Sequence, residues 1–250
     1  MPAVELVHAD GPGGAWAAAV SAAVREGRTV VLHCLVGEWS APDSPELALL
    51  LGREHRRYAS TRHAACRDRF VASRRLIKYA ASAALGVSPW TLELAISPGG
   101  RKYLRGCGWL GLSLSHTGNL LVLALSATGR VGADSEALSR SMCNPALVRR
   151  VCTDAEMAAL AALPAGERGR AMLRLWTLKE AYTKAIGVGM RLPFREFGFA
   201  VDGDKAVLHD TEGVPAHPVE WDFTTHWIDA DDSYVVSTAQ TRSPGHPLAA

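Results

Sequence analysis

The sequence has no long apolar run, no paired-cysteine motif and no low-complexity tract. Without a run of about eighteen uncharged apolar residues, a membrane-spanning helix is not expected. The five cysteines are odd in number and lack CxxC spacing, so neither a disulfide scaffold nor a structural zinc site is expected. The first residues also lack a basic stretch before an apolar one, and we expect no secretory signal. These absences predict reduced, mostly buried thiols in a cytoplasmic protein.

The chain instead has apolar bulk and a local excess of positive charge. Hydrophobic residues make up 48% of the 250, enough for the core of one large domain or two small ones. The net charge is only +2, but residues 53–78 hold nine basic side chains against two acidic ones. A solvated helix face is one interpretation of this excess. Interleaved apolar residues favour a packed helix whose arginines hold a small polyanion, more than nucleic acid, for which the rest of the chain has no motif.

The periodicity of apolar residues predicts an α+β fold. Amphipathic helices are expected at 64–85 and 170–186, each ended by a glycine, with a further helical stretch from residue 46. Strands are expected at 29–36, 91–96, 111–115, 120–126, 130–136, 196–201, 205–209, 219–227 and 233–241. Each half then has a long helix followed by strands, which differs from a parallel βαβ alternation. A frayed tail is expected at 243–250.

Two acidic residues, Asp134 and Glu136, are spaced i and i+2 on an expected strand. A strand places such a pair on one face. Like charges this close repel each other unless a cation or a proton lies between them. Mg²⁺ suits the pair, because it prefers carboxylate and phosphate oxygens. Two exposed acids at a strand end remain the alternative.

A second group, Trp176, Glu180 and Lys184, repeats every fourth residue on an expected helix and so shares one stripe. Glu180 could supply a third carboxylate or a general base. A plain surface helix with Glu–Lys pairs is the alternative interpretation. Trp176 is unusual on such a surface, although it could also belong to the core.

A serine and a histidine are adjacent at the end of another expected strand, as Ser115 and His116. Neighbouring strand residues point to opposite faces, so the two cannot act together as a hydrolytic dyad. His116 could donate to a phosphate or serve as a capping residue.

Together these motifs resemble the Sfp-type 4'-phosphopantetheinyl transferases over roughly residues 53–199. The family's G-x-D-x-E strand matches 132–136, its W-x-x-K-E-x-x-x-K helix matches 176–184, its L-S-H-S/T-G turn matches 114–118, and its basic helix matches 69–78. The chain departs from the family at Gly100-Arg101-Lys102, where a proline usually follows the basic residue. Lys102 could therefore share the role of Arg101.

The resemblance implies transfer of 4'-phosphopantetheine from coenzyme A to a serine of an apo acyl, peptidyl or aryl carrier protein, releasing adenosine 3',5'-bisphosphate. It implies a monomer of two structurally similar α+β halves related by a pseudo-twofold axis. Each half would have a long helix packed on a small, mainly antiparallel sheet. The halves would be residues 1–129 and 130–250, with the active site between them. Neither nucleic acid nor a membrane is an expected partner, and the fatty acid, polyketide and nonribosomal peptide pathways all stay open.

Site residues are carried over by position from the same resemblance. Mg²⁺, or alternatively Mn²⁺, would be held by Asp134, Glu136 and Glu180. Glu180 and Lys184 would be catalytic, with Glu180 as the base for the carrier serine, acting directly or through a water. Contacts to coenzyme A would come from Arg57, Arg69, Arg101, Ser115, His116, Lys179 and Lys184. Arg53 and Arg56 are alternatives to Arg57.

Overall fold

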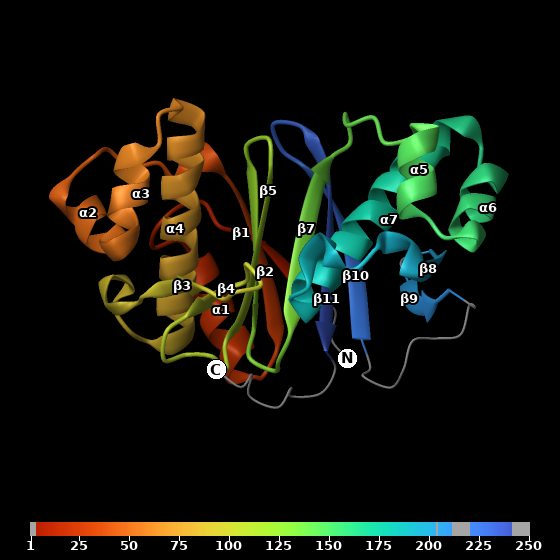
Figure 1. Cartoon of the computed structure of the whole chain (residues 1–250). Coiled ribbons are helices and arrows are strands. Elements are labelled where there is room, and N and C mark those ends of the chain that lie inside the picture. Colours follow the sequence, from red (N-terminus) through yellow and green to blue (C-terminus); the bar gives the residue numbers. More distant parts are fainter. Residues whose placement is uncertain (1–3, 204, 212–220, 242–250) are drawn as a thin grey trace.

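The computed structural model describes residues 4–203, 205–211 and 221–241, and it has two main sheets whose inner faces meet (Figure 1). The first sheet has the order β1-β2-β6-β5, in which only the β1–β2 pair is parallel. Its strands are β1 (Glu5–His8), β2 (Thr29–Leu35), β5 (Gly111–Thr117) and β6 (Leu120–Ser126). Two helices, α1 (Trp16–Arg25) and α4 (Ala64–Leu85), cover its outer face through a shared apolar core.

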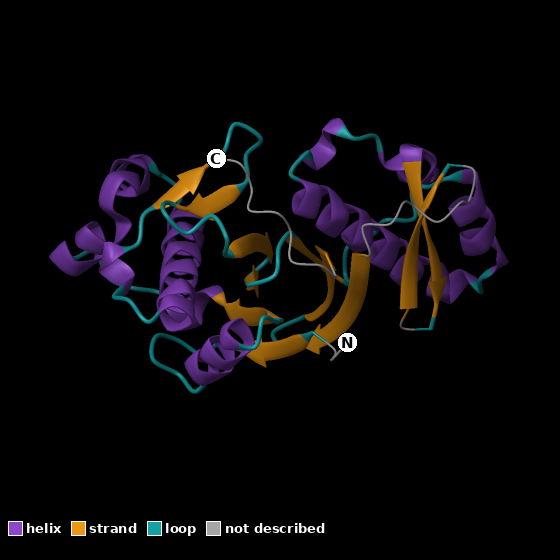
Figure 2. Ribbon diagram, turned by 90° about the horizontal axis from the view of Figure 1, so that it is seen from below, coloured by secondary structure: helices purple, strands orange, loops and turns teal. Residues whose placement is uncertain are grey.

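The second sheet is antiparallel throughout, with the order β10-β11-β7. Its strands are β7 (Val131–Ala137), β10 (Trp221–Asp229) and β11 (Ser233–Thr241). The long helix α7 (Ala165–Ile186) packs on its outer face, so helices lie on both outer sides of the paired sheets (Figure 2). Peripheral elements of this half are α5 (Pro145–Val151), α6 (Asp154–Ala162), β8 (Phe197–Asp202) and β9 (Lys205–Asp210).

The same order of elements occurs twice along the chain. A long helix, a two-stranded ribbon and two sheet strands follow one another as α4, β3 (Leu94–Ile96), β4 (Lys102–Leu104), β5 and β6, and again as α7, β8, β9, β10 and β11. An earlier strand completes each sheet, giving β2-β6-β5 and β7-β11-β10. The α+β class with two similar halves is therefore confirmed.

Apolar side chains of both sheets form a core between the halves. This core contains Val31 and Val122 from the first sheet and Ala133, Ile228 and Val236 from the second. Strand β5 lies beside β7, and the Ser113 hydroxyl accepts a hydrogen bond from the Ala133 backbone N–H at 3.0 Å. The two halves are thereby joined along the edge at which the candidate site lies.

The observed helices largely follow the sequence expectations. The first long helix has the expected bounds and ends at Gly86, whose φ of 68° is left-handed. The second begins earlier than expected, at Ala165, because its polar and exposed first turn shows no apolar period. The helix expected from residue 46 is α2 (Pro45–Leu51), and it is followed by the unexpected short helix α3 (His55–Ser60).

Other expectations were incomplete or wrong. Strand β3 begins only at Leu94, because a 3₁₀ turn occupies Pro89–Thr91. Elements α1, β1 and β4 were not expected. The thiols are not mostly buried: all five are free, and only two are fully buried. The expected tail at 243–250 and the start of the strand at 219 lie outside the described residues. In the part of the chain that is described, no helix has both the length and the apolarity to cross a bilayer.

Candidate active site

Strand β7 carries Asp134 and Glu136 on one face, and both are largely buried, with 7% and 8% of their surface exposed. The strand can lie close to α7 because residue 132 is glycine. A Cβ at this position would lie 1.9 Å from the Ala181 carbonyl oxygen. The glycine of the G-x-D-x-E motif therefore sets the distance between the two acids of β7 and the acid of α7.

Hydroxyl groups of β5 bind the two acids from the neighbouring sheet. The Ser115 hydroxyl donates to Asp134 Oδ1 at 2.8 Å, and the Thr117 hydroxyl donates to Glu136 Oε2 at 3.4 Å. Ser115 is buried, whereas His116 between the two hydroxyls is exposed. Serine and histidine thus face opposite sides, as expected, and Ser115 orients Asp134 directly.

Helix α7 adds Glu180 and Lys184 from the opposite wall. Lys184 Nζ donates to Asp134 Oδ1 at 2.6 Å, to the Ala133 carbonyl at 3.1 Å and to the Ser115 hydroxyl at 3.2 Å. Burial raises the pKa of the Glu180 carboxyl, and the nearby charge of Asp134 raises it further. Burial also raises the pKa of Glu136, which Arg140 opposes. The three carboxylates expected at the metal site therefore affect one another electrostatically.

Arg140, which the sequence motifs do not indicate, completes this cluster. Its guanidinium forms an ion pair with Glu136, four residues earlier, and lies 5.5 Å from the centre of the Trp176 ring. Trp176 in turn packs edge-on against Phe194 at 5.5 Å. The i,i+4 spacing of Glu136 and Arg140 was the available sequence signal for this pair. Such spacing indicates a contact within a helix, but Glu136 belongs to a strand and Arg140 to the turn after it.

Basic side chains gather beside the acids. Burial lowers the pKa of Lys102, and the neighbouring charges of Arg74 and Lys184 lower it further. Burial likewise lowers the pKa of His116, followed by the charges of Arg69 and Lys184. The charge of Arg57 also lowers the pKa of Lys102, and the Arg57 guanidinium lies over the Phe70 ring, 5.6 Å from its centre. Crowded cations of this kind are relieved by a bound anion.

Two residues expected to contact coenzyme A lie elsewhere. Lys179 is fully buried and donates to the carbonyls of Val151, Phe194 and Phe197, and it pairs with Glu156 at 2.8 Å. It cannot reach a ligand, because adjacent helix residues point about 100° apart and its neighbour Glu180 is the one that faces the cluster. We therefore correct its expected role in binding to a structural one.

The other displaced residue is Arg101, whose Nη1 donates to the Ala185 carbonyl at 3.1 Å in the last turn of α7. It therefore supports the helix end that carries Lys184. Lys102, not Arg101, lies within the electrostatic range of Lys184 and His116. Lys102 can therefore share the binding role expected of Arg101, and the contact of Arg101 with coenzyme A stays a prediction.

The basic segment 53–78 is divided between two roles. Arg74 is buried and pairs with Glu54 at 2.6 Å, Arg75 donates to the Trp39 carbonyl at 2.7 Å, and Lys78 donates to the Leu50 carbonyl. These three hold α4 against its surroundings. Only the remaining cations are open to solvent, so the segment does not offer one continuous basic face to nucleic acid.

The three carboxylates have the chemistry of a site for a divalent cation but are not arranged as one in this structure. Within the described ranges, no three acidic, histidine or cysteine side chains already lie close enough to ligate one metal ion. Asp134 is paired with Lys184, and Glu136 with Arg140. The chemistry of the set nevertheless fits a hard cation, since the carboxylates raise one another's pKa and a shared cation would relieve that repulsion.

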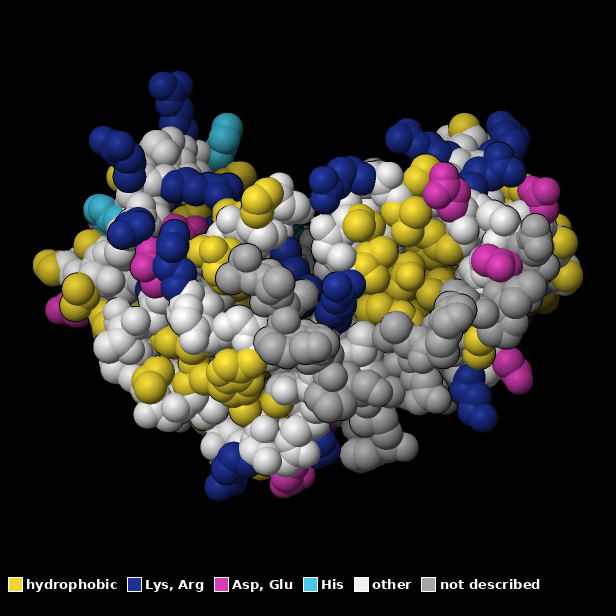
Figure 3. Space-filling view, turned by 60° about the horizontal axis from the view of Figure 1, so that its bottom comes forward, with side chains coloured by type: hydrophobic (Ala, Val, Ile, Leu, Met, Phe, Trp, Pro, Cys, Tyr) yellow, Lys and Arg dark blue, Asp and Glu magenta, His cyan; other side chains and the backbone are white. Residues whose placement is uncertain are grey.

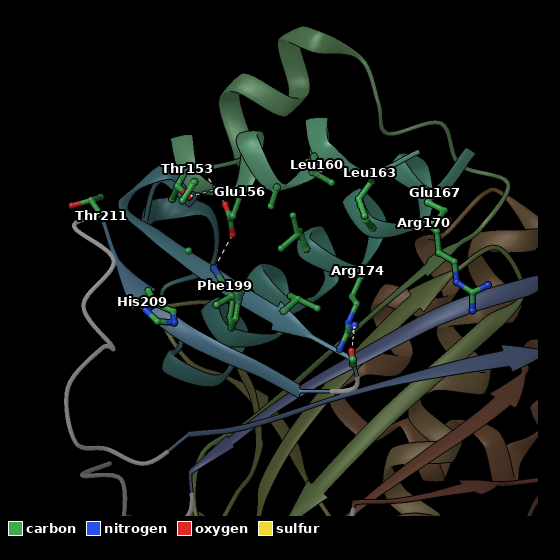
Figure 4. A pocket seen from close by; sticks show the side chains of 18 of the residues that line it. Thr153, Glu156, Leu160, Leu163, Glu167, Arg170, Arg174, Phe199, His209 and Thr211 are labelled. Carbon is green, nitrogen blue, oxygen red and sulfur yellow. Dashed lines mark hydrogen bonds between the residues drawn. The ribbon is translucent and has the colours of Figure 1, made fainter. Parts of the chain in front are cut away.

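A pocket of about 1010 Å³ opens on a different face of α7 (Figure 4). It lies between α6, the first half of α7 and the β8–β9 ribbon, and it has an apolar lining that includes Leu160 and Phe199. Arg170 at its edge stacks on the Trp227 ring at 3.7 Å. Hydrophobic side chains gather on this half of the molecule in Figure 3. None of the expected site residues lines the pocket, so its size does not mark the chemical site.

Comparisons with known proteins concern mainly the second half of the chain. Residues 130–239 match the sequence model of the 4'-phosphopantetheinyl transferase superfamily. The 4'-phosphopantetheinyl transferase HetI of Nostoc is 32% identical over 127 residues, which are 50% of this chain and 54% of that protein. A phosphopantetheinyl transferase of Thraustochytrium is 27% identical over 221 residues, 82% of this chain and 75% of that protein. The chain thus spans about half the length of the first relative.

Solved structures include a holo-(acyl-carrier-protein) synthase of Bacillus anthracis in complex with CoA (3',5'-ADP). It is 19% identical, covers 46% of this chain and 96% of its own, and has a TM-score of 0.36. A score this low carries no structural conclusion. The superfamily match spans β7 and α7, the two elements that hold Asp134, Glu136, Glu180 and Lys184. On this match and these relatives, residues 130–239 of the chain are similar to the 4'-phosphopantetheinyl transferase superfamily.

Proposed function

We propose that this protein transfers the 4'-phosphopantetheine group of coenzyme A to a serine of an apo acyl, peptidyl or aryl carrier protein. The observation that carries the proposal is that three electrostatically coupled carboxylates and Lys184, from β7 and α7, lie beside a group of crowded cations. The carboxylates can bind a cation or accept a proton, and the basic side chains can bind the phosphates of coenzyme A. The match of residues 130–239 to the superfamily's sequence model supports the same assignment.

In the proposed reaction, the hydroxyl oxygen of the carrier serine attacks the phosphorus next to the pantetheine arm. A new O–P bond forms, the bond to the other phosphate of the diphosphate breaks, and adenosine 3',5'-bisphosphate leaves. A serine hydroxyl is a weak nucleophile near neutral pH and needs a base. Glu180 is our choice, because burial and the charge of Asp134 raise its pKa towards the working range.

Lys184 has two functions in this proposal. Before a metal ion binds, it holds Asp134 in place through the 2.6 Å ion pair, and in the reaction its positive charge would compensate the charge of the leaving phosphate. Ser115 maintains this arrangement by bonding to both side chains. Arg101 positions the end of α7 through Ala185.

Mg²⁺ is the proposed cofactor, with Mn²⁺ as an alternative, and Asp134, Glu136 and Glu180 would hold it. When bound, the ion would neutralise charge on the phosphoryl oxygens. The pairs Asp134–Lys184 and Glu136–Arg140 must rearrange to admit it. Coenzyme A would be held by Arg57, Arg69, Lys102 and His116, whose charges crowd one another in the absence of an anion. The division into halves at residues 129 and 130, a monomeric state and a cytoplasmic location stay proposals.

The test is to incubate the protein with coenzyme A, Mg²⁺ and apo carrier proteins of the acyl, peptidyl and aryl types, and to weigh each carrier. We expect the mass gain of one phosphopantetheine group, lost on chelation and restored by Mg²⁺. Glu180→Gln should lower the rate by a factor of roughly 10² to 10⁴, because the base is lost. Glu167→Gln changes an exposed acid on the same helix and should leave the rate unchanged. No mass gain with any carrier type would contradict the proposal.

A further inference from the structure

Each of the two acids on β7 has its own positively charged partner in this structure. Asp134 is paired with Lys184, and Glu136 with Arg140. Arg140 also lowers the pKa of both Glu136 and Glu180, so its charge is felt by two of the three acids expected at a metal ion. Nothing in the sequence motifs assigns a role to Arg140.

The two cations are held very differently. Lys184 is fixed by three acceptors, namely Asp134, Ser115 and the Ala133 carbonyl, and 29% of its side chain is exposed. Arg140 follows the end of β7 in a turn, and 46% of its side chain is exposed. Apart from Glu136, its contact at the site is the face of Trp176, which permits sliding because a cation–π contact has no directional hydrogen bond. Arg140 is thus the partner that can leave with less loss.

The contacts of Glu136 show why Arg140 must leave when a divalent cation binds. Its Oε1 is bound by Arg140 and its Oε2 accepts the Thr117 hydroxyl. A neutral hydroxyl can remain beside a bound cation, but a guanidinium on the same carboxylate both blocks an oxygen and repels the incoming charge. Arginine and a divalent ion therefore exclude each other at Glu136.

We propose that Arg140 is the resident counter-ion of Glu136 in the metal-free enzyme and competes with the divalent cation for that carboxylate, while Trp176 provides the surface on which the released guanidinium rests. This inference rests on the proposed function, because it takes Glu136 to be a metal ligand. It gives Trp176 a role as well: the indole packs on Phe194 and offers its face to Arg140.

The experiment measures Mn²⁺ binding by calorimetry without coenzyme A, in the wild type, Arg140→Gln, Arg140→Lys and the control Arg149→Gln. Arg149 is an exposed arginine in the last turn of α5, away from the cluster. Arg140→Gln should bind Mn²⁺ roughly two- to fivefold more tightly, the range that a partly exposed ion pair supplies when it no longer has to be broken. Arg140→Lys keeps the charge without the planar fork and should lie between the two. Arg149→Gln should match the wild type.

Arg140→Gln should also unfold at a lower temperature than the wild type in metal-free buffer and regain the difference when Mn²⁺ is added. Mn²⁺ affinity in Arg140→Gln equal to or weaker than in a wild type that binds the ion would overturn the inference and leave the proposed transfer intact. A wild type that binds no Mn²⁺ would overturn the inference together with the metal assignment. A wild type that modifies no carrier protein would overturn the proposed function itself, whatever its metal affinity.

Discussion

At the scale of single residues, the geometry of the site depends on the absence of a side chain at Gly132. The strand and helix that carry the three acids approach each other here, and a Cβ would meet the Ala181 oxygen at 1.9 Å and the Ala185 nitrogen at 2.6 Å. Both atoms belong to the backbone of α7, so a rotamer change cannot relieve the overlap. Only a shift of the helix can.

Gly132→Ala should therefore destabilise the protein by about 1–3 kcal/mol, the usual cost of overpacking a core, and should lower the transfer rate by displacing Glu180 and Lys184. Gly166→Ala, in the first turn of α7, is the control. A Cβ there meets nothing within 4 Å, and alanine favours a helix, so stability should stay equal or rise by about 0.4–1 kcal/mol. Urea unfolding of both variants tests this, and equal stabilities would show that α7 can move freely.

At the scale of elements, α7 presents different faces to three neighbours. Glu180 and Lys184 face the site, Arg170 and Arg174 border the apolar pocket, and Lys179 points into the protein. Lys179 and Glu156 connect α7 to the start of α6 and to β8, because Glu156 also accepts from the backbone N–H groups of Thr153 and Phe199 at 2.8 Å. The lysine of the W-x-x-K-E motif therefore has a structural role, next to the glutamate that we propose as the base.

Lys179→Met should lower the free energy of unfolding by about 3–5 kcal/mol, since it leaves the Glu156 charge buried without its partner. The KM for coenzyme A should remain near the wild-type value at a temperature at which the variant is folded. Lys205→Met, at an exposed position of β9, should change stability by less than about 0.5 kcal/mol. Chemical unfolding and steady-state kinetics check both parts. A raised KM with unchanged stability would return Lys179 to ligand binding.

At the scale of the whole molecule, histidines lie where the two sheets approach each other, away from the carboxylates. His33 of β2 stacks on His8 of β1 at 5.1 Å and is influenced by His226 of β10. The pKa of His33 is lowered from 6.5 to about 4, chiefly by burial and also by the charges of His8 and His226, while Glu38 opposes the shift. His33 thus stays neutral in the folded protein, and the histidines that influence its pKa come from both sheets.

Because the pKa of His33 is lower in the folded state, the unfolded chain binds the extra proton between about pH 6.5 and pH 4. Stability contributed by neutral His33 is complete above this window and falls as the pH decreases through it, by at most about 3 kcal/mol. His33→Gln should reduce this pH dependence, whereas His63→Gln, at an exposed position, should keep it. Urea unfolding from pH 7 to pH 4 measures the slopes, and identical slopes in all three proteins would contradict the assignment.

Features that depend on neighbours along one element could be derived from the sequence. The helix at 64–85 and the strand containing Asp134 and Glu136 follow from local periodicity, and that same periodicity places the two acids on one face. The stripe of Glu180 and Lys184 follows in the same way from the turn of a helix. Local spacing determines the direction in which each side chain points from its helix or strand. The directions of these residues could therefore be predicted without the tertiary structure.

Features that depend on distant segments required the tertiary structure. Lys179 and Lys184 are equally plausible cations in the sequence, but only packing shows that the first is enclosed by carbonyls of three other segments and the second meets Asp134. Packing likewise shows that Lys102 interacts with Lys184, whereas Arg101 binds the Ala185 carbonyl. It also shows that Arg140 lies against Trp176. Burial and pairing are set by groups that are far apart in the chain. Local spacing therefore determined which acids share one face of an element, and the fold decided which cations neutralise them.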